Sequence, residues 1–255
     1  MEKINTTSEV EINNFLNTND VEIRNKLKNH LLNSPIPTEE LLNNIGVFLD
    51  RRIISRYLWI NELYQKIIHL HGNIFEFGVR YGQNISLFTS YRGIYEPFNH
   101  NRKIIGFDTW EGFPSVDKEK DPEEWKKGDY GTPENYEIFL DELIMLHEQM
   151  APIPSVIKHK LVKGDASKTL KKYFENHPET IISLAYFDFD IYQPTKDCLE
   201  YIIPFLTKGA IIAFDEINMI ECPGETVALR EVLGLNKFTI YHSQFRSNAG
   251  YIIFD

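Results

Sequence analysis

The sequence is poor in cysteine, in clustered basic residues and in long apolar runs. Its two cysteines, Cys198 and Cys222, lack the spacing of a metal-binding motif. The net charge is -10 at pH 7 and no basic stripe is present, which disfavours a nucleic acid or an anionic membrane as the partner. These absences favour a small-molecule substrate.

The start of the chain, MEKINTTSEVEINNF, lacks the basic and apolar regions of a signal peptide. No segment approaches the roughly 20 consecutive apolar residues that a membrane-spanning helix needs. We therefore expect a cytoplasmic protein without a membrane partner. A homo-oligomer is compatible with the sequence, because helices near the N-terminus could mediate a dimer.

The chain does contain enough apolar sequence for one core. It has 255 residues, of which 42% are hydrophobic, and this suits a single α/β domain with additions. Residues 1–70 are expected to form a helical N-terminal cap. Residues 71–255 alternate short apolar runs with helix-like stretches, which is typical of a parallel sheet with crossover helices. A polar insertion is expected at about 115–150, and such insertions often form lids or binding loops.

The apolar runs predict a seven-stranded, mostly parallel sheet flanked by helices. The turn-rich link FRSNA between the last two runs favours a closing antiparallel hairpin. The expected strands are residues 73–78, 103–108, 159–165, 180–190, 209–217, 237–244 and 250–255.

The first of these strands leads into the stretch EFGVRYGQN, with Glu76, Gly78 and Gly82 at a strand-to-helix turn. Ligands bind at this place in α/β sheets. Gly78 would let a ligand approach the backbone, and Gly82 would relieve crowding where the helix begins. The spacing is E-x-G-x-x-x-G and not G-x-G-x-x-G, so a pyrophosphate is not implied. A purely structural role for both glycines stays open.

Two further strands end in single aspartates. Asp108 ends the strand in IIGFDTWEGFP, where an acid accepts hydrogen bonds from ribose hydroxyls in nucleoside-binding sheets; the alternative is a helix cap or a surface acid. Asp165, in VKGDASKTL, either receives an adenine amino group or caps the helix that follows.

Two neighbouring strands end in pairs of acids: Asp188 and Asp190 in YFDFDIYQPT, and Asp215 and Glu216 in AFDEIN. Residues two apart in a strand share a face, and buried carboxylates need a positive partner. Oxygen ligands from adjacent strands suit Mg²⁺, Ca²⁺ or Mn²⁺. Alternatively, Asp190 and Glu216 cap helices or face solvent.

Taken together, FEFGVRYGQN, IIGFDTWEGFP, LAYFDFDIYQPTKDCLEYIIPFL and KGAIIAFDEIN resemble a known family. Over residues 70–255 the chain is similar to the class I S-adenosylmethionine-dependent methyltransferases, and within them to the macrocin O-methyltransferase family, which modifies sugar hydroxyls. The patterns FD-x-x-x-G-x-P and D-x-D-x-Y-x-x-T carry the resemblance. It implies a Rossmann-like sheet and methyl transfer to a sugar or sugar-nucleotide, in surface-polysaccharide or secondary-metabolite biosynthesis.

The resemblance also implies roles for particular residues. For Mg²⁺ it implies Asp188, Asp215 and Glu216, although family members commonly have an aspartate at the place of Glu216. The family's histidine base is missing between Phe113 and Leu146, so Tyr130, Asp129 or His147 would have to substitute for it, or Asp190 could serve; His242 is a further candidate base. The residues expected to hold S-adenosylmethionine are Glu76, Gly78, Tyr81, Gly82, Asn84, Asp108, Thr109, Trp110, Gly164, Asp165, Ala166 and Asp188.

Other interpretations stay open at this point. A catechol-like or nitrogen acceptor would suit the same metal, and a cofactor-binding protein without catalysis would explain the missing histidine. A nicotinamide-dependent oxidoreductase is disfavoured by the glycine spacing and by the four acids. Arg51, Arg52 and Arg56 either bind an anionic group on the substrate or form a solvated helix face.

Overall fold

The structure is a computed structural model that describes residues 18–255, in which one seven-stranded sheet forms the centre. Its order is β3-β2-β1-β4-β5-β7-β6, and β7 runs antiparallel to both of its neighbours, so the predicted architecture and closing hairpin are confirmed. The strands are β1 (Asn73–Phe77), β2 (Ile104–Asp108), β3 (His159–Lys163), β4 (Ile182–Phe187), β5 (Leu206–Phe214), β6 (Tyr241–His242) and β7 (Gly250–Phe254).

The central strands are continuous apolar runs because both faces of the sheet are covered by helices. Every residue of β4 is buried. Phe107, Phe77, Phe187 and Phe214 occupy one row of the register on neighbouring strands, and their ring centroids lie 5.3, 4.7 and 5.3 Å apart. This row fixes the alignment of four strand ends, and the loops that follow these ends carry the site.

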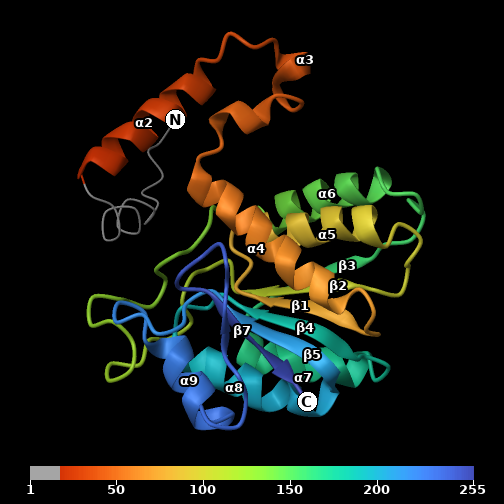
Figure 1. The fold of residues 1–255 in the computed structure, drawn as a ribbon, viewed down its shortest axis with the longest axis vertical. Coiled ribbons are helices and arrows are strands. Elements are labelled where there is room, and N and C mark those ends of the chain that lie inside the picture. Colours follow the sequence, from red (N-terminus) through yellow and green to blue (C-terminus); the bar gives the residue numbers. More distant parts are fainter. Residues whose placement is uncertain (1–17) are drawn as a thin grey trace.

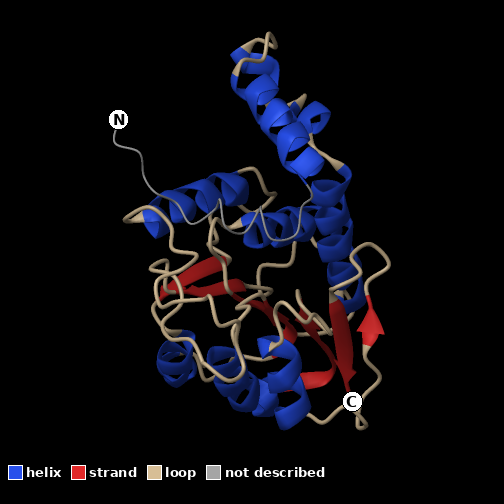
Figure 2. Ribbon diagram, turned by 90° about the vertical axis from the view of Figure 1, so that its left-hand side faces the viewer, coloured by secondary structure: helices blue, strands red, loops and turns tan. Residues whose placement is uncertain are grey.

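Two helical layers cover the sheet (Figures 1 and 2). One layer contributes Trp59, Ile85 and Leu140 to a core cluster, and the other contributes Leu170, Leu199 and Leu229 to a second cluster. The first layer consists of α4 (Arg51–Ile67), α5 (Gln83–Tyr95) and α6 (Tyr136–Gln149), and the second of α7 (Ala166–Asn176), α8 (Tyr192–Ile202) with its short extension η2 (Ile203–Phe205), and α9 (Gly224–Val232).

The expected helical N-terminal cap begins, in the described part of the chain, with α2 (Thr18–Leu32), α3 (Thr38–Leu41) and η1 (Ile45–Phe48). Figure 1 shows α2 and α3 extending away from the sheet. The last helix of this region, α4, differs from the others because Trp59, Leu63 and Ile67 on one of its faces are fully buried in the core of the sheet. Residues 1–17 of the predicted cap lie outside the described residues.

Two predicted strands are several residues shorter in the structure. The strand expected at 180–190 ends at Phe187, and Asp190 has a φ of 64° in the loop beyond it, so the prediction that Asp188 and Asp190 share one face of a strand is wrong. Only Tyr241 and His242 of the run 237–244 join the sheet. The insertion has no helix or strand between residue 115 and the start of α6.

Across residues 18–255, none of the helices combines the length and the apolar character that crossing a membrane requires.

Candidate active site

A cavity of about 1300 Å³ opens at the carboxyl ends of the parallel strands. Glu76, Gly82 and Trp110 are not among the residues that line it. Trp110 packs in the core and is 4% exposed. The other predicted site residues all line the cavity: Gly78, Tyr81, Asn84, Asp108, Thr109, Tyr130, Gly164, Asp165, Ala166, Asp188, Asp190, Asp215, Glu216 and His242.

The two glycines of the turn after β1 are required by the packing of the chain. Gly78 has a φ of 92°, and a Cβ atom there would lie 1.9 Å from the carbonyl oxygen of Asp188. Gly82 has a φ of 80°, and a Cβ atom there would lie 2.3 Å from the side chain of Leu140 on α6. Gly78 therefore brings the loop after β1 against the loop after β4, where the acids begin.

Asp108 joins two loops of the cavity wall. Its Oδ2 accepts a hydrogen bond from the backbone N–H of Arg80 at 2.7 Å, and its Oδ1 accepts one from that of Trp110 at 2.6 Å. The indole N–H of Trp110 donates to the Arg80 carbonyl at 3.0 Å. Burial raises the pKa of Asp108, and the backbone donors oppose that rise. Each carboxylate oxygen keeps a lone pair that a ribose hydroxyl can use.

Asp165 caps α7, which is one of the two roles predicted for it from the sequence. Its carboxylate accepts from the backbone N–H of Ser167 at 3.1 Å and from its hydroxyl at 2.7 Å, and it forms an ion pair with Lys168 at 2.8 Å. The residue also lines the cavity, so the cap and a contact with adenine are compatible.

Glu76 is a buried acid with an unused oxygen. Its side chain is 1% exposed, and its Oε2 has no hydrogen-bond partner within residues 18–255. Burial, and then the neighbouring charge of Asp188, raise its pKa well above the usual range. A buried polar atom without a partner is costly, and the ammonium group of a bound amino-acid moiety or a bridging water would satisfy it. Glu76 therefore fits a cofactor of that chemistry.

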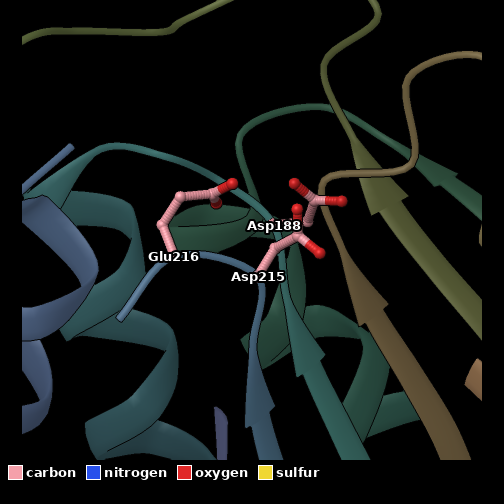
Figure 3. Close-up of side chains that lie close together, drawn as sticks. All are labelled: Asp188, Asp215 and Glu216. Atoms are coloured by element: carbon pink, nitrogen blue, oxygen red, sulfur yellow. The ribbon is translucent and has the colours of Figure 1, made fainter. Parts of the chain in front are cut away.

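Asp188 and Asp215 find their positive partners in two arginines (Figure 3 shows the acids). Arg56 on α4 reaches Asp188 Oδ2 at 3.1 Å through Nη1 and Asp215 Oδ2 at 2.9 Å through Nη2. Arg246, in the turn between β6 and β7, reaches the same oxygen of Asp215 at 2.7 Å. The Tyr186 hydroxyl donates to Asp215 Oδ1.

The pKa values of the two acids are shifted in opposite directions. Although burial opposes ionisation, Arg56 and Arg246 hold the pKa of Asp215 well below its usual range. Burial and the adjacent charge of Asp215 raise the pKa of Asp188. Neighbouring acids whose pKa values are driven apart are common at functional sites.

Sequence reasoning missed both arginine roles. The solvated helix face proposed for Arg56 is wrong, because its side chain is only 22% exposed and bridges both acids. A signal existed for Arg56, which lies three, four and seven residues before the buried Trp59, Ile60 and Leu63 and so falls on the apolar stripe of α4. The turn sequence around Arg246 carries no comparable signal.

Glu225 on α9 is a further residue that the sequence did not reveal. It is fully buried, and its Oε1 accepts from the backbone N–H groups of Phe189 at 3.1 Å and Asp190 at 3.3 Å. Its Oε2 accepts from the backbone N–H of Glu216 at 3.3 Å. One carboxylate therefore holds the loops after β4 and β5 together. In the sequence, Glu225 was recognisable only as an acid near the start of the segment that forms α9.

The residues present fit a divalent cation. Asp188, Asp215 and Glu216 each offer one oxygen, and these oxygens lie within 4.8 Å of one another; Figure 3 shows the three carboxylates gathered above the ends of β4 and β5. Glu216 Oε2 is buried without a hydrogen-bond partner in the described chain. Burial, and then Asp215, raise the pKa of Glu216 well above its usual range, and a bound cation would reverse that effect. A cation would compete with Arg56 and Arg246 for the carboxylates of Asp188 and Asp215.

Three of the candidate bases, His242, Tyr130 and Asp190, line the cavity, whereas Asp129 and His147 are not among its lining residues. His242 Nδ1 lies 2.8 Å from the Ser243 carbonyl, and when Nδ1 carries the proton, Nε2 can accept one. Tyr130 packs against Phe113 at 5.0 Å between ring centroids. Asp190 donates its backbone N–H to Glu225, which fixes the loop that carries its side chain.

Several solved structures of methyltransferases are similar to this chain. Two structures of CalS11, one described as a calicheamicin methyltransferase and the other as TDP-rhamnose 3'-O-methyltransferase, are 40% and 38% identical to it, with TM-scores of 0.90 and 0.83. Each covers 93% of this chain, and this chain covers 93% and 95% of theirs. The O-methyltransferase NovP shares the fold, with a TM-score of 0.57 and 16% identity over 79% of this chain and 80% of NovP. Neither a protein-family model nor a curated protein sequence matches. The chain therefore belongs to the S-adenosylmethionine-dependent methyltransferases of the CalS11 type, which confirms the resemblance predicted from the sequence.

Proposed function

We propose that this protein transfers a methyl group from S-adenosylmethionine to a hydroxyl of a sugar, free or linked to a nucleotide, with the assistance of a divalent cation. The observation that carries the proposal is the 40% identity to CalS11 over 93% of both chains, since another structure of CalS11 is described as a TDP-rhamnose 3'-O-methyltransferase. The biosynthesis of surface polysaccharides or secondary metabolites in the cytoplasm is the setting we propose.

The size of the cavity supports a reaction between two bound molecules. Its volume of about 1300 Å³ exceeds the roughly 300–1,000 Å³ of a pocket for a single drug-sized ligand. Gly78, Asp108 and Asp165 line the part where the cofactor would lie. Asp188 and Asp215 mark the part where the acceptor hydroxyl would meet the methyl group.

Methyl transfer from a sulfonium is an in-line displacement at carbon, so the protein must align the acceptor oxygen and take its proton. We propose that Glu76 and Asp108 hold and orient the cofactor. Asp188, Asp215 and Glu216 would hold the cation, which when bound supplies a Lewis acid that lowers the pKa of a coordinated hydroxyl. The proton would pass to His242 Nε2, Asp190 or Tyr130.

The test is methyl transfer to TDP-rhamnose, followed by mass spectrometry of the sugar and by the release of S-adenosylhomocysteine. We expect activity that EDTA abolishes and Mg²⁺ restores, and that Asp188→Ala lowers strongly. Activity that survives both EDTA and Asp188→Ala would refute the metal, whereas binding of S-adenosylhomocysteine without methylation of any sugar would refute the acceptor.

A further inference from the structure

A group of arginines lines the cavity next to the acids. Arg24 from α2 and Arg51 and Arg52 from the first turn of α4 are part of its wall. Arg52 precedes Arg56 by four residues, which is about 6 Å along a helix. Arg56 contacts Asp188 and Asp215, so Arg52 lies one helical turn along α4 from the residue that contacts the acids where methyl transfer is proposed.

Two of these arginines are oriented by nearby aspartates through long ion pairs. Arg52 Nε lies 3.5 Å and Arg24 Nε lies 4.0 Å from Asp50 Oδ2, and Arg52 Nη1 lies 3.8 Å from Asp20 Oδ2. The other oxygen of Asp50 caps α4 by accepting from the backbone N–H groups of Arg52 and Ile53 at 2.8 and 3.1 Å, which fixes the start of this helix.

The group keeps unused donors. Arg52 Nε is buried and has no hydrogen-bond acceptor within residues 18–255. Arg51 is exposed, and in the same part of the chain no ion pair to it is present. Within residues 18–255, these three arginines lie near two aspartates, so the charges of the five residues sum to +1, and the Nε donor of Arg52 has no acceptor. Guanidinium groups match phosphate oxygens in geometry and charge.

We propose that Arg24, Arg51 and Arg52 bind the diphosphate of a nucleoside-diphosphate-linked sugar. This inference rests on the proposed function, because it names the substrate class of the same site. A sugar ring would bridge the gap between the acids, where the hydroxyl reacts, and the arginines, where the phosphate attached to the ring would lie. The cluster would thus select a sugar nucleotide over a free sugar or a neutral glycoside.

The first experiment measures the binding of thymidine diphosphate to the full chain loaded with S-adenosylhomocysteine, by isothermal titration calorimetry. Arg51→Gln and Arg52→Gln should each weaken binding roughly 10-fold, and the double variant more, because a charge-assisted hydrogen bond is lost. The control is Lys171→Gln. Lys171 is exposed on α7 and does not line the cavity, so this substitution removes the same charge away from the proposed site. Equal affinity of all variants overturns the inference.

A second measurement separates folding and cofactor effects from the diphosphate site. The affinity for S-adenosylhomocysteine and the melting temperature of Arg51→Gln should equal those of the parent protein. If this variant instead loses affinity for S-adenosylhomocysteine, the arginines serve the cofactor and the inference is overturned.

Turnover distinguishes this inference from the proposed function. With TDP-rhamnose, Arg51→Gln should raise KM roughly 10-fold and leave kcat unchanged, and methyl rhamnoside should be a poor substrate of both proteins. Equal KM values for the two sugars would overturn the diphosphate site while leaving sugar methylation intact. Loss of thymidine diphosphate binding in the variants, without methylation of either sugar by the parent, would support the site and refute the proposed function.

Discussion

Replacing Arg246 by glutamine should strengthen the binding of a divalent cation. Arg246 donates to Asp215 Oδ2 at 2.7 Å, and Asp215 belongs to the three-carboxylate group that fits a cation. A cation that coordinates Asp215 must displace this charge-assisted hydrogen bond, which contributes about 1.5–3 kcal/mol. Removing the guanidinium should therefore tighten cation binding by roughly 10- to 100-fold.

The same substitution should cost some stability in the absence of a cation. The two arginines lower the pKa of Asp215 from 3.8 to about 2, against the effect of burial. This corresponds to about 2.5 kcal/mol at neutral pH. Because Arg56 stays in place beside Asp215, Arg246→Gln should lose only part of this stabilisation. This folded-state pKa is depressed, so the loss should be full above pH 4 and should fade as the pH drops toward 2.

The assay is a Mn²⁺ titration followed by electron paramagnetic resonance, with S-adenosylhomocysteine bound, together with urea denaturation of the metal-free protein. Arg230→Gln is the matched control, since Arg230 is exposed on α9 and does not line the cavity. Equal Mn²⁺ affinity of the Arg246→Gln and parent proteins would refute the competition. No binding by either protein would refute the metal site itself.

Two further substitutions test buried contacts, one between α6 and β3 and one in the cavity wall. Glu148→Gln should destabilise the protein by about 3 kcal/mol at pH 7, because His159, Lys158 and Arg92 lower the pKa of this fully buried acid from 4.5 to about 2 despite its burial. The difference from the parent in urea denaturation should shrink as the pH falls from 4.5 toward 2, and a difference that stays constant would contradict this account. Gly78→Ala should weaken the binding of S-adenosylhomocysteine and cost several kcal/mol of stability, because the added Cβ meets the Asp188 carbonyl at 1.9 Å. The control is Gly93→Ala on α5, where nothing lies within 4 Å of the added Cβ. Equal melting temperatures of the two variants would show that the loop after β1 adapts to the added Cβ and would contradict this prediction.

The order of the elements and the place of the site were predictable from local sequence. Continuous apolar runs such as that of β4 identify parallel strands buried on both faces, and the acids that follow them mark the carboxyl edge of the sheet. Asp108, Asp188 and Asp215 could therefore be assigned to one edge before the structure was known. The ends of the strands were less predictable. Asp190, for example, has a positive φ that does not fit a strand, and its residue type alone does not indicate that conformation.

What neutralises these acids depended on contacts between distant parts of the chain. Arg56 lies 159 residues before Asp215, and Arg246 lies 31 residues after it. Likewise, Glu225 ties Asp190 to Glu216 across two loops. The sequence by itself determined that buried carboxylates lie at the strand ends and need a positive partner. The apolar runs that form the buried strands, and the acids that follow them, can be recognised from neighbouring residues alone. Only the tertiary structure decided that two arginines fill that role, because the pairing of charges depends on which segments the fold brings within a few ångströms of one another.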